Sequence, residues 1–200
     1  MRIALLGAGR IGAAHARVIA VDPRVDRLTI ADVDADRAST VARAVGGHAA
    51  ADAASAIADA DALVIATSTT THAELIRAGI ARGIPVFCEK PIAGDLATSI
   101  AVAQEVDAAG AQVQIGFQRR YDHGFAAARQ HLDEGAIGRL EMFRALTCDP
   151  EPAPFAYLAT SGGIYADMAI HDIDTRRLTR HLRSTGAQNG CILALAAGEV

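Results

Sequence analysis

Titratable side chains gather in one short apolar stretch, SGGIYADMAIHDIDTRR, at residues 161–177. Asp167 and His171 are four residues apart, so on a helix they share one face and can reach the same ligand. Imidazole suits a general base that removes a hydroxyl proton, and a carboxylate can orient a hydroxyl. Because an unpaired carboxylate is costly to bury, the stretch is either a solvated helix face or part of a site. Asp172 could belong to the same site, whereas Asp174 could simply be solvated.

A second candidate site lies near the start of the sequence. The motif GxGxxG directly follows the apolar run RIALL and begins a helix-like stretch. In a dinucleotide site the first glycine permits a tight turn, the second lets a pyrophosphate approach the backbone, and the third lets helix and strand pack closely. The helix N-terminus then faces the phosphates. A glycine-rich turn without a ligand is the alternative. The predicted cofactor contacts of this loop are Gly7, Gly9, Arg10, Ile11 and Gly12.

A carboxylate stands where such a site needs one. Asp32 follows Gly12 by 20 residues, at the end of a predicted strand, where it can accept hydrogen bonds from the adenosine ribose. A helix N-cap or turn aspartate is the alternative. A carboxylate repels a 2′-phosphate, so NAD is favoured over NADP. Arg37 could in principle receive that phosphate, which keeps NADP as the less favoured cofactor.

Two more polar loops follow apolar runs. The hydroxyl-rich loop TSTTTH comes after ALVIA, and the tripeptide EKP comes after PVFC. Helix capping alone could explain the first loop, and a solvent-exposed turn could explain the second. Their position at strand ends favours contact with the cofactor. The predicted contacts are Thr67, Ser68, Thr69, His72, Glu89 and Lys90.

The elements that must position these residues alternate between strand and helix over residues 1–117, which predicts a doubly wound parallel sheet of the α/β class. Such a sheet binds its ligand at the carboxyl ends of the strands. The rhythm changes afterwards, so a second domain is predicted over 118–200. The predicted strands are 2–6, 27–32, 62–66, 85–88 and 112–117, and the predicted helices are 11–20, 34–46, 71–83 and 95–110. Beyond them we expect a helix over 121–135 and an exposed strand over 141–147.

The composition excludes several classes of protein. The chain has 200 residues, of which 51% are hydrophobic, which favours a packed globular protein over a disordered one. The net charge of −4 comes without basic runs, and tryptophan is absent, which argues against nucleic-acid binding. No apolar stretch has membrane-spanning length and no signal peptide opens the chain. Three widely spaced cysteines indicate reduced thiols in the cytoplasm and no zinc site.

Several motifs together make the chain resemble the Gfo/Idh/MocA oxidoreductase family, and among its members the bacterial inositol 2-dehydrogenases. The shared segments occur in the family's order over residues 1–177. They are GAGRIG followed by His15, ATSTTTHAELI, CEKP, GFQRRYD and GGIYADMAIHDID. GxGxxG alone is common to many folds, whereas the EKP segment followed by the last two segments is much more specific.

The resemblance implies a Rossmann NAD(P)-binding domain followed by an α/β domain with a mostly antiparallel sheet, which often forms the homo-oligomer interface. It implies oxidation of a secondary alcohol on a cyclic polyol such as myo-inositol. Lys90 matches the lysine of EKP, and Asp167 and His171 match the acid and histidine of the last motif. Lys90 would stabilise the developing alkoxide. Arg119 and Arg120 could contact the nicotinamide side or tie the two domains together.

The sequence departs from the family near its end. Family members continue for well over a hundred residues past the HDID segment, whereas this sequence continues as RRLTRHLRSTGAQNGCILALAAGEV. Arg176 and Arg177 stand where a more apolar helix face is expected. We therefore expect an incomplete second domain whose apolar sheet face lacks cover, which favours aggregation or a partner. The alternatives to inositol oxidation are another sugar or cyclic diol as substrate, or an NAD-binding remnant without turnover.

Overall fold

The computed structural model describes residues 1–139, and the chain divides into two compact units between Gly116 and Phe117. The expected strand over 141–147, the cluster at 167–174 and the antiparallel sheet of the second domain lie outside the described residues. The two units are described separately below.

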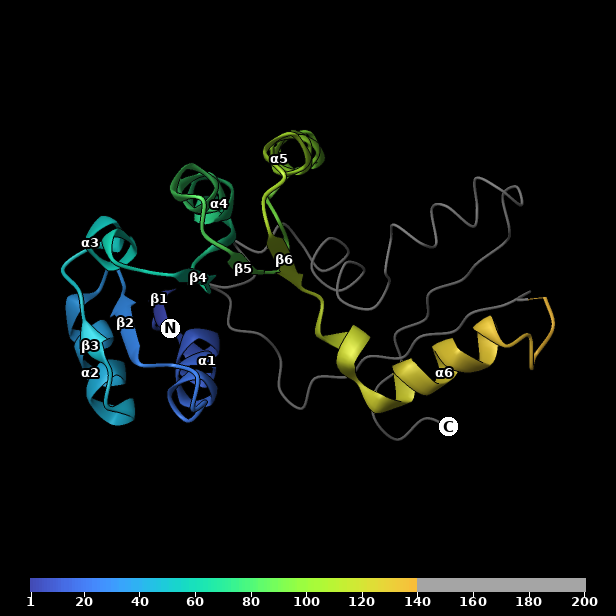
Figure 1. The fold of residues 1–200 in the computed structure, drawn as a ribbon, viewed down its shortest axis with the longest axis horizontal. Coiled ribbons are helices and arrows are strands. Elements are labelled where there is room, and N and C mark those ends of the chain that lie inside the picture. Colours follow the sequence, from blue (N-terminus) through green and yellow to red (C-terminus); the bar gives the residue numbers. More distant parts are fainter. Residues whose placement is uncertain (140–200) are drawn as a thin grey trace, which may run out of the picture. The chain divides into compact units, whose positions relative to one another are not determined.

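The first unit is built on a six-stranded parallel sheet, which confirms the predicted doubly wound parallel sheet and adds one strand to the five expected (Figure 1). The strand order is β3-β2-β1-β4-β5-β6, so the direction of winding reverses between β1 and β4. In a doubly wound sheet the ligand crevice lies at that reversal, beyond the carboxyl ends of the strands. The strands are β1 (Arg2–Leu6), β2 (Arg27–Ala31), β3 (His48–Ala49), β4 (Ala62–Ile65), β5 (Val86–Glu89) and β6 (Val113–Gly116).

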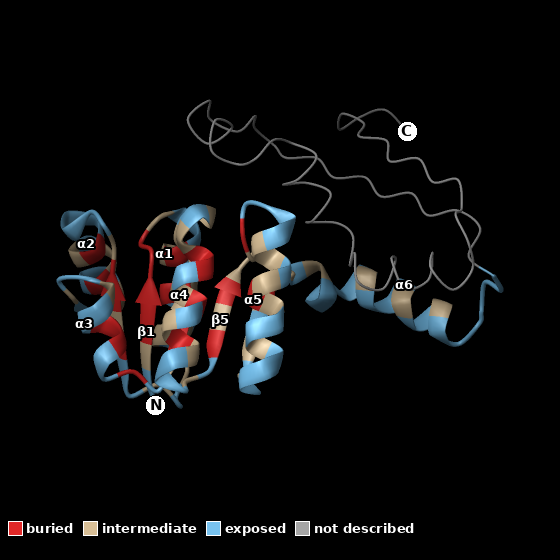
Figure 2. Cartoon of the chain, turned by 90° about the horizontal axis from the view of Figure 1, so that it is seen from above, coloured by how far each residue is buried: buried red, intermediate tan, exposed pale blue. Residues whose placement is uncertain are grey.

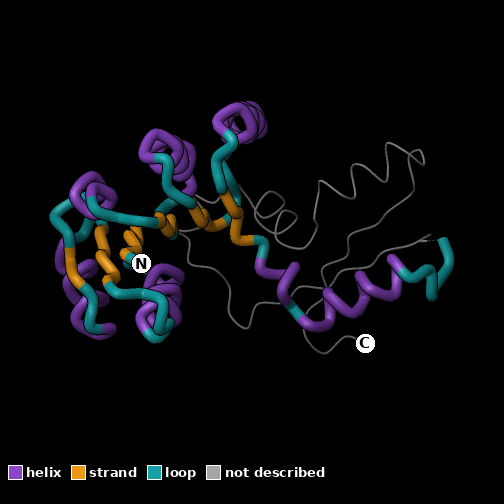
Figure 3. The backbone as a smooth tube through the Cα atoms, viewed as in Figure 1, coloured by secondary structure: helices purple, strands orange, loops and turns teal. Residues whose placement is uncertain are grey.

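Helices cover both faces of this sheet. Figures 1 and 3 show α1 and α2 on one face and α3, α4 and α5 on the other. Each face has its own hydrophobic core, which explains why the strands are apolar on both sides. In Figure 2 the ribbon of this unit is red where residues are buried, along the strands and on parts of the helices. The helices are α1 (Arg10–Ala20), α2 (Ala35–Val45), α3 (Ala53–Ala58), α4 (Thr69–Arg82) and α5 (Leu96–Ala109).

Strand β1 shows how the short apolar runs serve both cores. Leu5 packs into the core under α1 and α2, whereas Ala4 and Leu6 pack into the core under α3, α4 and α5. Successive strand residues point to opposite faces, so a strand between two helix layers needs apolar residues throughout. That requirement is why RIALL was recognisable as a buried strand.

Two elements of the first unit were not predicted. Strand β3 has only two residues, both exposed, and α3 has six residues. Neither is long enough for a periodic apolar pattern to stand out in the sequence. Helix α4 begins at Thr69, two residues before the predicted start at residue 71. This earlier start changes which residues of the hydroxyl-rich loop face the core.

The second unit is described up to residue 139, and this described part contains two helices. A short 3-10 helix, η1 (Gln118–Tyr121), precedes α6 (His123–Asp133), which lies within the predicted helix over 121–135. Asp122 caps α6 by accepting hydrogen bonds from two backbone N–H groups of its first turn. None of the helices in the described part of the chain is both long and apolar enough to cross a bilayer.

Candidate functional site

The predicted cofactor residues of the first unit converge on one edge of the sheet. Gly7 follows β1, Asp32 follows β2, Thr67 lies just beyond β4, and Lys90 follows β5. These strands are parallel, so their carboxyl ends meet at the same edge. Strands β1 and β4 border the reversal of strand order, which is where a doubly wound sheet binds its ligand. The candidate site therefore begins at this edge.

The glycine loop has the close approaches that its spacing predicts. Gly7 has φ +94°, a conformation that L side chains rarely adopt, and a Cβ there would lie 2.4 Å from Ala66 O. A Cβ at Gly12 would lie 1.9 Å from Gly7 O, so only glycine lets α1 pack against the loop. By contrast, a Cβ at Gly9 would meet nothing within 4 Å. Gly7 and Gly12 thus build the turn, and Gly9 borders open space.

The N-termini of α1 and α4 are not capped by side chains, unlike those of the other helices in the first unit. Gly9 is the N-cap of α1 and Ser68 is the N-cap of α4, and neither makes a side-chain cap hydrogen bond. Aspartates cap α2, α3 and α5. The two uncapped helices follow β1 and β4, the strands on either side of the crevice. Their backbone N–H groups and positive dipole ends are suited to a pyrophosphate, so the residues present fit a dinucleotide.

Asp32 is fixed beside the glycine loop. Its Oδ2 accepts a hydrogen bond from the Ala8 N–H at 2.6 Å, and its Oδ1 accepts one from the Asp34 N–H at 2.9 Å. The side chain is only 7% exposed, and Arg37 Nη1 lies 3.4 Å from Oδ1. The cap of α2 is Asp34, so Asp32 is not an N-cap, whereas its bond to the Asp34 N–H, two residues on, is that of a turn aspartate. Oδ2, which accepts only the Ala8 N–H, retains a lone pair that can accept from a ribose hydroxyl.

The hydroxyl-rich loop forms a network of its own. Thr67 Oγ1 lies 2.7 Å from Thr71 Oγ1, and Ser68 Oγ lies 3.0 Å from Thr70 Oγ1. The Thr71 hydroxyl also donates to Ser68 O at 2.9 Å. The Ser68 side chain does not cap α4, so capping does not explain why this residue is a serine. Thr69 begins the helix and is partly exposed at the same edge.

His72 does not fit the predicted role of a cofactor contact, and this is a correction. The side chain is 1% exposed. Its Nδ1 lies 2.7 Å from Pro91 O and its Nε2 lies 3.2 Å from Thr67 O, so both ring nitrogens face backbone carbonyls. No nitrogen is left for a ligand. His72 instead connects the loop after β4 with the segment after β5.

The segment after β5 is contacted from α1 as well. Glu89 Oε1 lies 2.7 Å from His15 Nε2, and the His15 ring packs edge-on against Phe87 with centroids 5.3 Å apart. Lys90 is half-buried directly after this pair. His15 was noted in the sequence only as part of a family motif. Its partner lies 74 residues away, so no local pattern could indicate the contact.

Cys88 belongs to the core beneath this edge. The side chain is fully buried, and burial, with a smaller effect of the Glu89 carboxylate, raises the pKa of Cys88 to about 12. A thiol with such a pKa stays protonated and is a poor nucleophile. Cys88 therefore contributes packing to the site and no chemistry.

The remaining predicted residues belong to the second unit or lie outside the described residues. Arg119 lies in η1 of the second unit, with its guanidinium 5.1 Å from the centroid of Phe125. Arg120 lies in the same short helix, 5.7 Å from the centroid of Phe117. Asp167 and His171 lie outside the described residues. The described structure thus builds the cofactor side of the candidate site and the position of Lys90.

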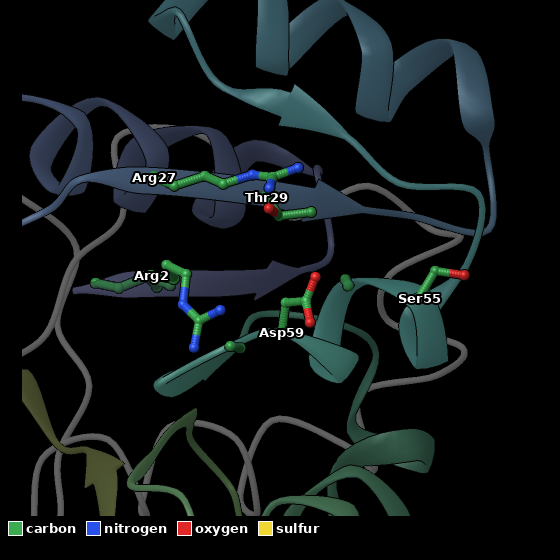
Figure 4. A pocket seen from close by; sticks show the side chains of 8 residues that line it. Arg2, Arg27, Thr29, Ser55 and Asp59 are labelled. Carbon is green, nitrogen blue, oxygen red and sulfur yellow. The ribbon is translucent and has the colours of Figure 1, made fainter.

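A small hollow at the opposite edge of the sheet is not a second dinucleotide site. It lies at the amino ends of β1 and β2 and has a volume of about 40 Å³, too small for a nucleotide (Figure 4). Arg2, which lines it, already forms an ion pair with Asp61 at 2.7 Å, and this pair holds the pKa of Asp61 at about 2. The other polar lining residues are Arg27, Thr29, Ser55 and Asp59.

Comparison with protein families gives two matches along the chain. A family model described as an oxidoreductase family with an NAD-binding Rossmann fold matches residues 1–117. A model described as a GFO/IDH/MocA C-terminal domain matches residues 125–183. The first match covers the whole sheet, both uncapped helices and Lys90.

Individual relatives agree with these matches. The chain is 41% identical over 178 residues to an inositol 2-dehydrogenase of Rhizobium meliloti, covering 88% of this chain and 54% of that protein. It is 34% identical over 181 residues to a scyllo-inositol 2-dehydrogenase (NAD(+)) of Bacillus subtilis, covering 88% and 53%. A crystal structure of a myo-inositol dehydrogenase from Corynebacterium glutamicum superposes with a TM-score of 0.77 at 42% identity, covering 86% and 52%. The chain spans about half the length of the curated relatives it matches.

Proposed function

This chain belongs to the Gfo/Idh/MocA family of NAD-binding oxidoreductases, and from that premise we propose that it contributes to an NAD-dependent dehydrogenase that oxidises a ring hydroxyl of a cyclic polyol. The preferred substrate is myo-inositol, and the product is the 2-keto compound. The relatives named as inositol dehydrogenases support this choice of substrate class. When bound, NAD supplies the hydride acceptor, and the protein supplies position and charge.

The carboxyl edge of the sheet is proposed to hold the cofactor. The uncapped N-terminus of α1 and the open space beside Gly9 suit the pyrophosphate. Asp32, with both oxygens already fixed by backbone amides, suits the adenosine ribose and disfavours a 2′-phosphate. Thr67, Ser68 and Thr69 lie at the start of α4, on the other side of the crevice. Glu89 remains a proposed contact at the end of β5.

The observation that carries the proposal is the position of Lys90. It is the only lysine in a sequence with 19 lysine and arginine residues. All the other residues in this set are arginines, whose guanidinium groups cannot give up their proton in proteins. A side-chain primary amine occurs once, at the carboxyl end of β5, where it can hold a substrate hydroxyl and stabilise the alkoxide. Counting the lysines in the sequence is enough to single out Lys90.

The remaining chemistry is proposed for Asp167 and His171. His171 would accept the proton of the substrate hydroxyl as general base. The carbon that bears this hydroxyl would lose its hydride to NAD, so that the alcohol becomes a ketone. Asp167, four residues earlier, would orient a neighbouring hydroxyl. Arg119 is proposed either to contact the nicotinamide side or to tie the units together. We further propose that the reaction takes place in the cytoplasm, since the widely spaced cysteines suit a reducing compartment.

The experiment compares cofactor binding with turnover in the purified chain. NADH binding is followed by fluorescence, and NADH production is measured with myo-inositol, scyllo-inositol, glucose and a cyclic diol. We expect binding of NADH and the highest kcat/KM with myo-inositol. Lys90→Ala should abolish turnover and retain NADH binding, and Lys90→Arg should not restore turnover. A higher kcat/KM with another polyol would overturn the substrate, and binding without any turnover would support the NAD-binding remnant.

A further inference from the structure

Two histidines contact the segment Glu89–Pro91 from opposite helices, with Lys90 between their contact points. His15, on α1, lies 2.7 Å from the Glu89 carboxylate. His72, on α4, lies 2.7 Å from the Pro91 carbonyl. Helices α1 and α4 belong to opposite faces of the sheet (Figure 1). The segment that carries the single lysine is thus held from both faces.

The burial of His72 needs a reason beyond packing. Within residues 1–139 it is the most deeply buried polar or charged residue, at 1% exposure. Its neighbours on α4, Ala73 and Ile76, belong to the hydrophobic core, and an apolar residue would fill the same space without hydrogen bonds to satisfy. A neutral imidazole can donate only one hydrogen bond. The shorter contact assigns that donor to Nδ1, so His72 Nδ1–H donates to Pro91 O and Nε2 faces Thr67 O at 3.2 Å.

His15 is placed to act on the same segment through a side chain. Its ring is oriented by the edge contact with Phe87, and its Nε2 can donate to the Glu89 carboxylate. Both groups are partly buried, which strengthens such a bond relative to water. Glu89 is the last residue of β5, so fixing its side chain limits rotation of the backbone that leads into Lys90.

We propose that His15 and His72 form a clamp that sets the position of Lys90, and that both are positioning residues of the reaction. The proposal rests on the proposed function, in which the Lys90 amine holds the substrate hydroxyl. Lysine reaches its target on a flexible four-carbon chain, so the backbone at its base must be fixed for the amine to arrive correctly. A misplacement of about 1 Å can cost about 100-fold in rate.

The variants are chosen to remove or retain one hydrogen bond at a time. In His72→Asn the amide nitrogen takes the place of Nδ1 and keeps the bond to Pro91, whereas in His72→Gln the nitrogen takes the place of Nε2 and faces Thr67. His72→Leu removes both the bond to Pro91 and the contact with Thr67. His15→Gln keeps a donor for Glu89, and His15→Leu removes it. His48→Asn, at an exposed histidine on β3, is the matched control.

The first measurement needs neither NAD nor substrate, because the chain has a single ε-amine. The full chain is treated with an acetylating reagent, and mass spectrometry gives the rate at Lys90 relative to the α-amine of Met1. Losing one hydrogen bond of the clamp should raise this ratio about 3- to 10-fold, since the half-buried segment opens more often. We expect the rise in His72→Leu, His72→Gln and His15→Leu. The ratio should stay near wild type in His72→Asn, His15→Gln and His48→Asn.

The second measurement separates positioning from general damage. In the variants that lose the clamp, kcat for the polyol should fall about 10- to 100-fold, while KM for NAD changes less than about twofold. His72→Asn should recover most of kcat. If His72→Leu does not fold, as judged by its thermal melt, the comparison of His72→Asn with His72→Gln decides the role of His72.

The two measurements test different claims, the first the clamp itself and the second its role in the proposed reaction. Unchanged Lys90 acetylation in folded His72→Gln and His15→Leu would overturn the clamp, whatever the activity. Changed acetylation in a chain that oxidises no polyol would support the clamp as a structural device and overturn the proposed function. If kcat falls as far in His72→Asn as in His72→Gln, the assignment of the hydrogen bond from His72 Nδ1 to Pro91 O is also overturned.

Discussion

The Asp32 carboxylate accepts a hydrogen bond from the Ala8 N–H at 2.6 Å, which joins the end of β2 to the glycine loop after β1. The same carboxylate is 7% exposed and receives a second backbone N–H, from Asp34. One side chain thus holds the loop that would receive a pyrophosphate and offers a lone pair to a ribose. Loop shape and cofactor choice are therefore linked through Asp32.

Replacing Asp32 should weaken cofactor binding and relax cofactor choice together. In Asp32→Asn the charge is lost and the acceptor for Ala8 is weaker, so NADH affinity should fall about 10-fold. NADPH affinity should fall less or rise, because the repulsion of a 2′-phosphate is removed and Arg37 lies 3.4 Å from the same carboxylate. Fluorescence titration with NADH and with NADPH measures the ratio of the two affinities. Asp34→Ala, which removes the side-chain cap of α2, is the control: stability should drop with the ratio unchanged. An unchanged ratio in Asp32→Asn would contradict this role.

Two glycines of the same loop should respond in opposite ways to alanine. At Gly12 a Cβ would lie 1.9 Å from Gly7 O, so Gly12→Ala should lower the free energy of unfolding by roughly 3 kcal/mol. At Gly9 the space is open, so Gly9→Ala should cost about 1 kcal/mol or less, and its methyl group should block the pyrophosphate. Urea unfolding and NADH titration separate the two effects. If Gly9→Ala bound NADH as well as the wild type, the phosphates would not approach the backbone there.

Cys88 should make stability fall at high pH. The thiol of the unfolded chain ionises near pH 9, whereas burial raises the pKa of the folded thiol to about 12. The unfolded state therefore loses its proton first, and the contribution that is fully present below pH 9 is lost as the pH rises from 9 to 12. Between pH 9 and 12 the free energy of unfolding should fall more steeply with pH in the wild type than in Cys88→Ala. The two slopes should differ by roughly 1.4 kcal/mol per pH unit.

Urea titrations of wild type and Cys88→Ala at several pH values between 7 and about 11 provide this test. The difference between the two slopes isolates Cys88 from tyrosine and arginine ionisation. Parallel pH profiles for the two proteins would mean that the Cys88 thiol reaches solvent in the folded state.

The parts of the fold that were predictable are those with a strong local signature. RIALL, ALVIA and the other apolar runs are buried on both faces, and a continuous apolar run is the mark of such a strand. The glycine spacing indicated the turn because Gly7 and Gly12 each have a steric reason to be glycine. Strand β3 was missed because two exposed residues that pair with one neighbour leave no pattern to find.

The misassigned residue, His72, shows how a local reading fails. It follows five hydroxyl residues and was therefore read as part of a polar loop. Helix α4 begins at Thr69, and its buried positions are His72, Ala73, Ile76 and Gly79. That spacing is helical, so extending the apolar period of the helix backwards would have put residue 72 on the buried face. The contact between His15 and Glu89 could not be found this way, because it depends on the packing of α1 against β5.

The ends of the six-stranded sheet carry a last consequence. In the described part of the chain, β3 ends the sheet on one side with two residues and β6 ends it on the other with four. Short terminal strands present few unpaired amides and carbonyls to another molecule, which limits pairing between sheets of neighbouring copies. The dinucleotide-binding unit should therefore resist fibrillar self-association even at high concentration, and any self-assembly should depend on side-chain contacts rather than on continuation of the sheet.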